Sequence, residues 1–544
     1  MSRHLLVAIF LVTVVFGLRA PQLRAQTVTG SLSGHVTDSS GALVPNVRIT
    51  VRQTDTGTRR QTVSGAEGYY LISFLPLGTY EVTAELLGFA TVVHKNIDVT
   101  LNKTTSLDIA LTPSTVQETV SVSEAAPLID TASGQIRRTL DDSFIDVLPS
   151  AGRNFLGLTP LLPGFQTNPT SGQNNYTLSS GSSVSFNGTG TRSTTFLTDG
   201  VTNDDGSENQ NRQGVNISTV KELQVITNNY APEFGRGSGA IVLVETKSGS
   251  NTTHGEAYWY LRNSALDARG FFDPRNVKKP VSQSHRAGGT LGGHLLRDRL
   301  FYFGSLERFW QPGSQLVTTD LLPAEFRTPM VDPSLPDAAA RTTWVQSLID
   351  RFPADLTPNN PALSPYAYTG SLPRSSHTKD YTGRLDWRVS NKDLLYVRYQ
   401  FSTYHFGLTK EFVKGENVVS DHRFQSLGLT ETHVFTPTTT GEFRFGFGRR
   451  RITVNFLSGE ATPPIVRWSL SGFGSSIIGN ASAFPEQRYQ NDFQYVYNIS
   501  AQRGRNTLRA GTDIRRTQLN DRTENYNRGF WTFGSASGFN LNPA

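Results

Sequence analysis

Residue types that commonly carry catalysis or bind metals are sparse in this sequence. The chain has no cysteine, which removes thiol nucleophiles, disulfide scaffolds and cysteine-based zinc or iron–sulfur sites. Its ten histidines are scattered, and no Ser-His-Asp order typical of a nucleophilic hydrolase is recognisable. We therefore expect a protein that is not an enzyme and that has no cofactor and no resident metal.

Two local patterns resemble functional sites but favour another interpretation. Asp204 and Asp205 lie in a polar stretch, where carboxylates more often cap or solvate a loop; a cation site is the weaker alternative. Gly235, Gly237 and Gly239 suggest a nucleotide loop, yet neither G-x-G-x-x-G before a helix nor a Gly-Lys-Ser/Thr ending is present. Strand-forming residues follow, so we interpret these glycines as a bend with close backbone packing.

The composition predicts a chain built mainly from short strands. The 544 residues are 37% hydrophobic, 18% charged and 10% aromatic. Helical bundles need more Ala, Glu, Lys and Leu, and disordered chains lack aromatic residues. The net charge of +6 is small for this length, so it indicates scattered surface cations and no nucleic-acid partner.

Residues 1–25 have the pattern of a secretory signal peptide. Arg3 precedes an apolar run from Leu5 to Leu18, and Ala25 offers a cleavage point. The run is shorter than the roughly 20 apolar residues of a spanning helix, although an N-terminal anchor helix is the alternative. No later segment is long and apolar enough to cross a membrane as a helix. We therefore expect export, with membrane insertion only as a β-barrel.

Residues 26–112 are predicted to form a small β-sandwich, because short alternating strands such as 47–51 follow one another closely. The motifs are Gly-x-Val-x-Asp-x-x-Gly from Gly34, Val-Pro-x-Val from Val44, and Leu-Pro-x-Gly-x-Tyr-x-Val from Leu75. Together they resemble the carboxypeptidase regulatory-like domain. Despite that name, the block has no His-Glu-x-x-His spacing and no plausible set of metal ligands.

Residues 128–249 follow a linker at 113–127 and mix strand signals with a helix-like stretch near Asp141 to Leu148. Asp199-Gly200 between apolar strand residues predicts a hairpin turn. The motifs Phe-Leu-x-Asp-Gly-Val, Val-x-Glu-Leu-x-Val and Glu-Phe-Gly-x-Gly-x-Gly-Ala-Ile-Val occur in order. They resemble the plug domain of TonB-dependent outer-membrane transporters, in particular its Oar-like branch, which implies an α+β plug.

Residues 250–544 form a series of amphipathic segments, apolar on one face and polar on the other, as in transmembrane strands. One sheet of a soluble sandwich is the alternative, but dense aromatic residues and long polar loops, such as Phe326 to Ser376, favour a barrel. The segments resemble the N-terminal part of an Oar-like barrel, which implies location in the outer membrane of a Gram-negative cell. We therefore expect a mainly β chain: sandwich, plug and partial antiparallel barrel.

About ten candidate strands follow His254, judged by alternation. They lie near Tyr258, Gly289, Phe303, Asp386, Val397, Leu427, Phe445, Tyr495, Arg509 and Trp531. Plugged transporters use about 22 strands, so the sequence is expected to be a fragment that lacks the remaining barrel strands.

The segment Glu118, Thr119, Val120, Ser121 and Val122 resembles a TonB box, placed after the N-terminal extra domain and before the plug. Alternating valines make it extended and β-prone, so it could add as a strand to a partner's sheet edge. The alternative is that it is the first plug strand or a linker.

The resemblance implies energy-coupled uptake of a ligand such as a siderophore or a carbohydrate. Its partners would be the TonB complex of the inner membrane, outer-membrane lipid and that small ligand. Two alternatives remain open: a surface binding or adhesion protein, and a secretion-associated Oar-like protein without import activity.

Overall fold

The computed structural model describes the chain from residue 29 to residue 533, with gaps. The residues that it leaves out are 1–28, 115–118, 123–132, 149–152, 168–183, 191, 207–209, 232, 272, 409–411, 413–417, 457–464, 470–474, 479–484, 505, 524–529 and 534–544. The predicted signal peptide therefore lies outside the described residues. The described part of the chain is mainly β, as its composition predicted, and its strands form six sheets.

The N-terminal unit, which comprises strands β1 to β9, consists of two sheets that enclose one hydrophobic core. Its strands are β1 Gly30–Asp38, β2 Arg48–Gln53, β3 Arg59–Val63, β4 Tyr69–Leu75, β5 Gly78–Glu85, β6 Thr91–Val99, β7 Thr104–Ser106, β8 Ile109–Leu111 and β9 Thr119–Val122. One sheet joins β4, β1, β7 and β8, and the other has the order β3-β2-β5-β6-β9. Ile49 and Val51 of β2 point into the shared core, as their alternation with polar residues predicted.

The inner unit, residues 133–249, is built around a mixed sheet with the order β10-β15-β16-β13-β14. Its strands are β10 Ile136–Asp141, β11 Phe165–Thr167, β12 Val184–Phe186, β13 Thr194–Thr198, β14 Val201–Thr202, β15 Val220–Asn228 and β16 Ala240–Thr246; its helices are α2 Asp142–Val147, η2 Phe155–Leu161 and η4 Ile217–Thr219. The predicted helix is α2. It begins at Asp141, whose carboxylate accepts a 3.0 Å hydrogen bond from the Phe144 N–H.

The third unit is a sheet of nine antiparallel strands connected in sequence order, here called the long sheet. The strands are β17 His254–Asn263, β18 Gln283–Leu296, β19 Leu300–Asp320, β20 Ala367–Arg388, β21 Asp393–Leu408, β22 Val418–Thr436, β23 Thr439–Phe456, β26 Glu486–Arg503 and β27 Asn506–Thr523. Within the described residues β17 and β27 do not pair, so the sheet is not closed. Nine of the ten predicted strand segments lie in it.

Two predictions for residues 250–544 were wrong in part. The segment at Trp531 is β28 (Phe530–Phe533), which joins β24 (Ile465–Ser469) and β25 (Ser475–Ile478) in a separate small sheet. The predicted loop from Phe326 to Ser376 contains helix α3 (Ala338–Ile349) and the start of β20.

The physical reasons are local. Val345, Leu348 and Ile349 of α3 have helical spacing and pack on a small core with Leu322 and Phe352. The polar start of β20 continues as a strand because it pairs in register with the end of β19. Short 3-10 turns η5 (Ser264–Leu266) and η6 (Ala324–Phe326) lie in the connections of this unit.

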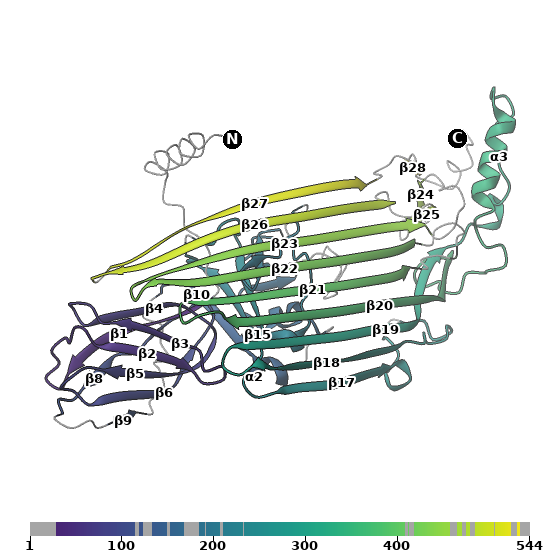
Figure 1. Ribbon diagram of the computed structural model, residues 1–544. Helices are drawn as coiled ribbons and strands as arrows, with labels where there is room; N and C mark the ends of the chain where they lie inside the picture. Colours follow the sequence, from purple (N-terminus) through teal and green to yellow (C-terminus); the bar gives the residue numbers. More distant parts are fainter. Residues whose placement is uncertain are drawn as a thin grey trace, which may run out of the picture.

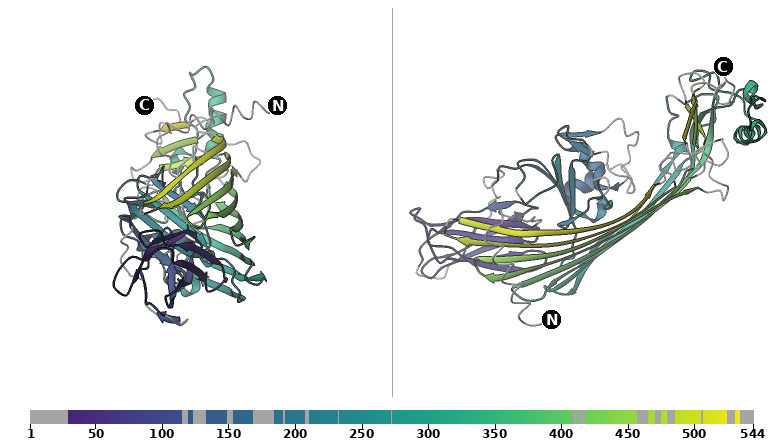
Figure 2. Two further views of the ribbon diagram at one scale, coloured as in Figure 1. Left: turned by 60° about the vertical axis from the view of Figure 1, so that its left-hand side comes forward. Right: turned by 90° about the horizontal axis from the view of Figure 1, so that it is seen from above.

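The two ends of the long sheet differ. At one end, the short-turn end, tight turns join β18 to β19, β20 to β21, β22 to β23 and β26 to β27; the opposite end carries the longer connections and α3. The N-terminal unit lies at the short-turn end (Figure 1). The inner unit lies on the concave face of the sheet, here called the inner face (Figure 2). Among the described residues, no helix is long and apolar enough to span a membrane.

Candidate functional site

The hairpin between β13 and β14 brings a carboxylate to the inner face of the long sheet. Its turn is Asp199-Gly200, as predicted, and both residues have positive φ, 48° and 73°. The Asp199 carboxylate is fixed inside its own unit, because it accepts bonds from the Thr246 N–H (2.7 Å) and the Thr246 hydroxyl (3.0 Å). The turn therefore presents an oriented charge to the sheet.

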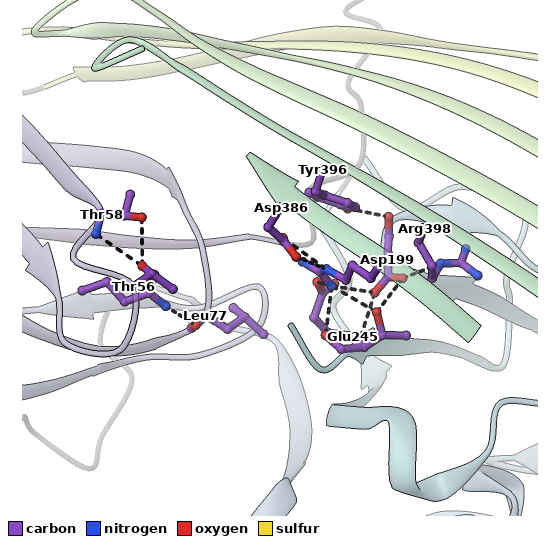
Figure 3. Close-up of polar contacts among 11 residues, drawn as sticks. Thr56, Thr58, Leu77, Asp199, Glu245, Asp386, Tyr396 and Arg398 are labelled. Atoms are coloured by element: carbon purple, nitrogen blue, oxygen red, sulfur yellow. Dashed lines mark hydrogen bonds and ion pairs between the residues drawn. The ribbon is translucent and has the colours of Figure 1, made fainter. Parts of the chain in front are cut away.

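Two arginines of the long sheet face this carboxylate (Figure 3). Arg398 of β21 forms an ion pair of 2.5 Å from Nε to the Asp199 Oδ2. Arg384 of β20 lies 3.6 Å from Oδ1 of Asp199 and donates a 2.9 Å hydrogen bond to Glu245. The Tyr396 hydroxyl donates to the Asp199 backbone carbonyl at 3.0 Å. These contacts connect the inner unit to two neighbouring strands.

The charged side chains of this network are buried, and their burial determines how much the ion pairs contribute to stability. The side chains of Asp199 and Arg398 are both 0% exposed, and that of Arg384 is 8% exposed. Removing such charges from water costs several kcal/mol each, so the pairs contribute little net stability when intact. Removing one partner leaves the other charge buried without compensation, which lowers the stability of the protein substantially. Burial also raises the pKa of Glu245 well above its ordinary value, and the positive Arg384 opposes that shift.

A second set of contacts joins the following loop to β23 and β26. Arg212 forms a 2.8 Å ion pair with Asp492, and Asp205 pairs with Arg450. Asp204 accepts a 2.7 Å bond from the Phe196 N–H inside the inner unit. The sequence favoured carboxylates that cap or solvate the loop: neither solvates it, because both are buried, whereas the backbone bond to Asp204 agrees with capping. Burial raises the pKa of Asp204 to about 6.

Glycines in the long sheet, which forms a wall beside the inner unit, leave room for these contacts. A Cβ added at Gly446 of β23 would lie 2.4 Å from the Val201 Cγ1. A Cβ at Gly448 would lie 2.1 Å from the Arg212 guanidinium carbon. Real Cβ atoms do not approach other atoms so closely, so a larger residue at either glycine would force the Val201 or the Arg212 side chain to shift.

A cavity of about 1280 Å³ lies between the inner unit and β17 to β21, toward the end with long connections. Its lining is mixed, with charged Arg153, Arg286 and Asp267 beside aromatic Tyr260 and Phe309. The Arg153 guanidinium lies 4.7 Å from the centre of the Tyr260 ring, a cation–π contact. Nothing in the local sequence indicates that Arg153 lines a cavity. Its position in a cavity depends on strand pairings that the sequence does not reveal.

The N-terminal unit is attached to the inner unit by polar and apolar contacts. The Leu101 N–H donates to the Glu222 carboxylate at 2.7 Å, and Gln224 donates to the Leu101 carbonyl at 2.7 Å. The Leu101 side chain is buried in a cluster with Ile226 and Leu243 of the inner unit. These contacts hold the N-terminal unit against the inner unit.

The N-terminal unit also contacts the turns of the long sheet. Thr62 donates to the Pro437 carbonyl at 2.8 Å. Asp393, Glu431 and His433 form a group whose ligand-type atoms lie within 4.8 Å of one another. Burial lowers the pKa of the nearby Arg60 to about 10, while the negative charges of Asp393 and Glu431 act in the opposite direction. Within this group His433 pairs with Asp393 at 2.6 Å, and the Arg60 guanidinium donates to the neighbouring Lys392 carbonyl at 3.3 Å, so polar contacts join the two units here.

The candidate TonB box is described only in part. Glu118 lies outside the described residues. Thr119 to Val122 form β9, which pairs in parallel with β6 from Thr91 to His94. Val120 is 44% exposed at this edge of the sheet. The segment is extended, which both sequence interpretations require, so its role stays a prediction.

With this geometry established, comparison with known proteins gives the family. Residues 245–543 match the family described as an outer membrane beta barrel domain, and residues 31–112 match the carboxypeptidase regulatory-like domain. The first match covers more than half of the chain, which therefore belongs to the outer membrane beta barrel domain family. The predicted location in the outer membrane is confirmed.

One curated relative narrows this assignment. The chain is similar to the TonB-dependent transporter Oar of Myxococcus xanthus, with 28% identity over 271 residues. The match covers 47% of this chain and 24% of the relative, so the chain spans about a quarter of that relative's length. The resemblance to the Oar-like TonB-dependent proteins is thereby confirmed.

Solved structures show weaker similarity. The outer membrane transporter YddB from Escherichia coli has 9% identity and a TM-score of 0.48, over 70% of this chain and 48% of its own. The siderophore receptor PirA from Acinetobacter baumannii has 13% identity and a TM-score of 0.43, over 70% and 48%. Similarities at this level do not carry a ligand over to this chain.

Proposed function

We propose that this chain acts in a TonB-dependent outer-membrane receptor that imports a ligand with energy supplied from the inner membrane. The observation that carries the proposal is the seating of the inner unit on the barrel wall by buried charges, Asp199 to Arg398 and Arg212 to Asp492. A ligand that passes along this face must displace the inner unit. Displacement exposes or separates these pairs, which requires an energy source.

The proposed organisation follows the sequence boundaries. Residues 1–25 are the signal peptide, 26–112 the regulatory-like β-sandwich, 113–127 the linker, 128–249 the plug and 250–544 barrel strands. The shared core of β1 to β8 supports the sandwich, and the position of the inner unit on the concave face supports the plug. In this proposal the short-turn end faces the periplasm, because outer-membrane barrels have short turns there and long loops outside.

Coupling to TonB is proposed to use residues Glu118 to Val122. The pairing of β9 with β6 leaves Val120 at the outermost strand of its sheet. An extended edge segment offers main-chain N–H and C=O groups to a partner strand. The segment belongs to the N-terminal unit, which lies at the short-turn end, and in the proposed orientation a periplasm-spanning partner can reach that end.

The ligand is proposed to enter through the cavity beside Arg153. Its mixture of charged and aromatic side chains suits a polar organic molecule such as a siderophore or a carbohydrate.

The test is growth of a deletion strain that carries the full-length gene on a plasmid. Single siderophores and single glycans serve in turn as the only iron or carbon source, with and without functional TonB. Import predicts growth on at least one source that needs both proteins. Ligand retention at the surface without TonB-dependent growth would contradict import and favour the adhesion alternative. Loss of an exported enzyme with uptake intact would favour the secretion alternative.

A further inference from the structure

The outer face of the long sheet, opposite the inner unit, carries an apolar belt. Side chains alternate along each strand, so the neighbours of inner-facing Arg384 and Arg398 point outward. One directly paired row across six strands shows the belt: Leu385, Val397, Leu429, Phe445, Tyr495 and Ile514. Ile514 is 61% exposed and Leu385 47% exposed. Such a row faces lipid in a protein of the outer membrane.

A second outward-facing row lies six residues from the first along each strand, for example from Leu385 to Lys379. This row is mainly charged, whereas the first is apolar. This second row, here called the cation row, lies toward the long connections. Its members are Arg308, Lys379, Thr403, Arg423, Arg451 and Tyr489, each directly paired with the next. Four of the six positions carry a positive charge.

The pairing within the cation row is unfavourable for the sheet alone. Arg308 lies directly opposite Lys379, and Arg423 lies directly opposite Arg451. Like charges directly opposite each other on one face destabilise a strand pair. In the described part of the chain none of the four forms an ion pair with a carboxylate, and the nearest acid in the next row, Asp421, contacts His405 at 2.7 Å.

Three of the four cations have further local features that bear on anion binding. The Nε of Arg423 is buried without a hydrogen-bond partner among the described residues. The guanidinium of Arg308 lies 5.5 Å from the Trp310 ring centre, and that of Arg451 lies 5.8 Å from the Tyr489 ring centre. Aromatic rings at these positions hold the side chains on the outer face while leaving their donors free.

We propose that the cation row binds the phosphate groups of an anionic lipid headgroup in the outer leaflet. The guanidinium fork matches phosphate oxygens in pairs, and a phosphate between Arg423 and Arg451 removes their mutual repulsion. The two like-charged pairs are separated by about three strand spacings, roughly 14 Å. A large headgroup with two phosphate groups can neutralise both pairs at once. The proposal depends on the membrane location and not on import.

The experiment measures lipid binding to the full-length protein by native mass spectrometry. The probes are a diphosphorylated glucosamine lipid (lipid A) and the same lipid without phosphates. The double variant Arg423→Gln/Arg451→Gln should bind the diphosphorylated lipid roughly 10- to 30-fold more weakly, at about fivefold per cation near a membrane surface. The dephosphorylated lipid should bind wild type and variant equally. The matched control is Arg275→Gln/Lys278→Gln, which removes two exposed cations from the β17–β18 connection and should change nothing.

A third variant separates binding from folding. Arg423→Glu creates an opposite-charge pair with Arg451, so the sheet should be at least as stable as wild type, yet phosphate binding should fall. Retained binding by that variant, equal binding of the two lipids, or an equal loss in the control would overturn the proposal. Full displacement of the lipid by inorganic pyrophosphate at equal concentration would assign the row to a soluble anion and would overturn it as well.

Discussion

Asp199 has two distinct sets of partners. Its hydrogen bonds to Thr246 stay within the inner unit, whereas its ion pair with Arg398 crosses to the barrel wall. The first set shapes the turn and the second holds the unit in place. Substitutions that keep the shape of the side chain can therefore separate the two functions.

We expect Asp199→Asn to lower the free energy of unfolding by about 3–5 kcal/mol, because Arg398 is left as a buried uncompensated charge. The amide oxygen still accepts from the Thr246 N–H. Arg398→Met should cost a similar amount, and the double variant should lose less than the sum by about 1–3 kcal/mol. Urea unfolding of the folded protein in detergent, followed by tryptophan fluorescence, gives these values. Strictly additive losses would show that the two residues do not interact.

Glu222 makes attachment of the N-terminal unit dependent on pH. Burial raises the pKa of its carboxyl to about 7, and the bond from the Leu101 N–H opposes the rise. A raised pKa means that the proton favours the attached state. Attachment is therefore strongest below the ordinary pKa of 4.5 and weakens as the pH rises to about 7.

The variant Glu222→Gln keeps an oxygen acceptor for Leu101 and removes the titration. We expect its attachment to be constant between pH 5 and pH 8, and stronger than wild type at pH 8 by up to about 3 kcal/mol. A fluorescent label on Lys103→Cys reports attachment, since the chain has no other cysteine. Lys221→Gln keeps the Glu222 carboxyl and should keep the pH dependence, with a higher midpoint, because the Lys221 charge lowers the pKa of Glu222. Parallel pH curves for wild type and Glu222→Gln would contradict the assignment.

At the scale of elements, β9 offers the sharpest test of energy coupling. Val120→Pro fixes φ and removes an N–H, so pairing with an added strand should fail, whereas Val120→Ala keeps the backbone groups. We expect Val120→Pro to bind ligand as wild type does and to lose energised uptake at least tenfold. Val120→Ala should change uptake less than twofold. Normal uptake by the proline variant would place the coupling site elsewhere in the chain.

Alternation identified most elements of this fold but not their partners. Period-two patterns located nine strands of the long sheet, because each has one face toward lipid and one toward polar groups. The same pattern at Trp531 could not show that β28 pairs with β24 in another sheet. The start of β20 was missed because its polar residues form a strand only through pairing with β19.

The charge network could not be predicted for the same reason. Asp199 appeared in the sequence as a turn residue, and Arg398 as a polar position of an alternating strand. Their contact depends on how the inner unit sits on the sheet, and no local pattern encodes that placement. Asp204 and Asp205 were expected to cap or solvate a polar loop because polar residues surround them in sequence, although both are buried and Asp205 pairs with Arg450 of the barrel wall.

At the scale of the whole molecule, import requires that the inner unit move relative to the wall. The Val201 Cβ lies 3.3 Å from the position that a Cβ on Gly446 would take, near the separation found in disulfides. We expect Val201→Cys/Gly446→Cys to form a disulfide that leaves ligand binding intact and abolishes uptake until a reductant is added. The single variant Val201→Cys serves as the control, because a side chain on Gly446 alone would meet the Val201 methyl group. Uptake by the oxidised double variant would show that transport leaves this contact in place.

In the orientation proposed above, with the short-turn end toward the periplasm, the hairpin of β19 and β20 extends beyond the cell surface. Its strands have 21 and 22 residues, so each is about 70 Å long, or roughly 50 Å in height at the usual strand tilt. A bilayer covers only about 25 Å of that height. The remainder forms a rigid stalk with α3 near its tip (Figure 1). In that orientation α3 is accessible from outside the cell, and a peptide tag inserted at Asp337 should be stained by antibodies on intact, unpermeabilised cells.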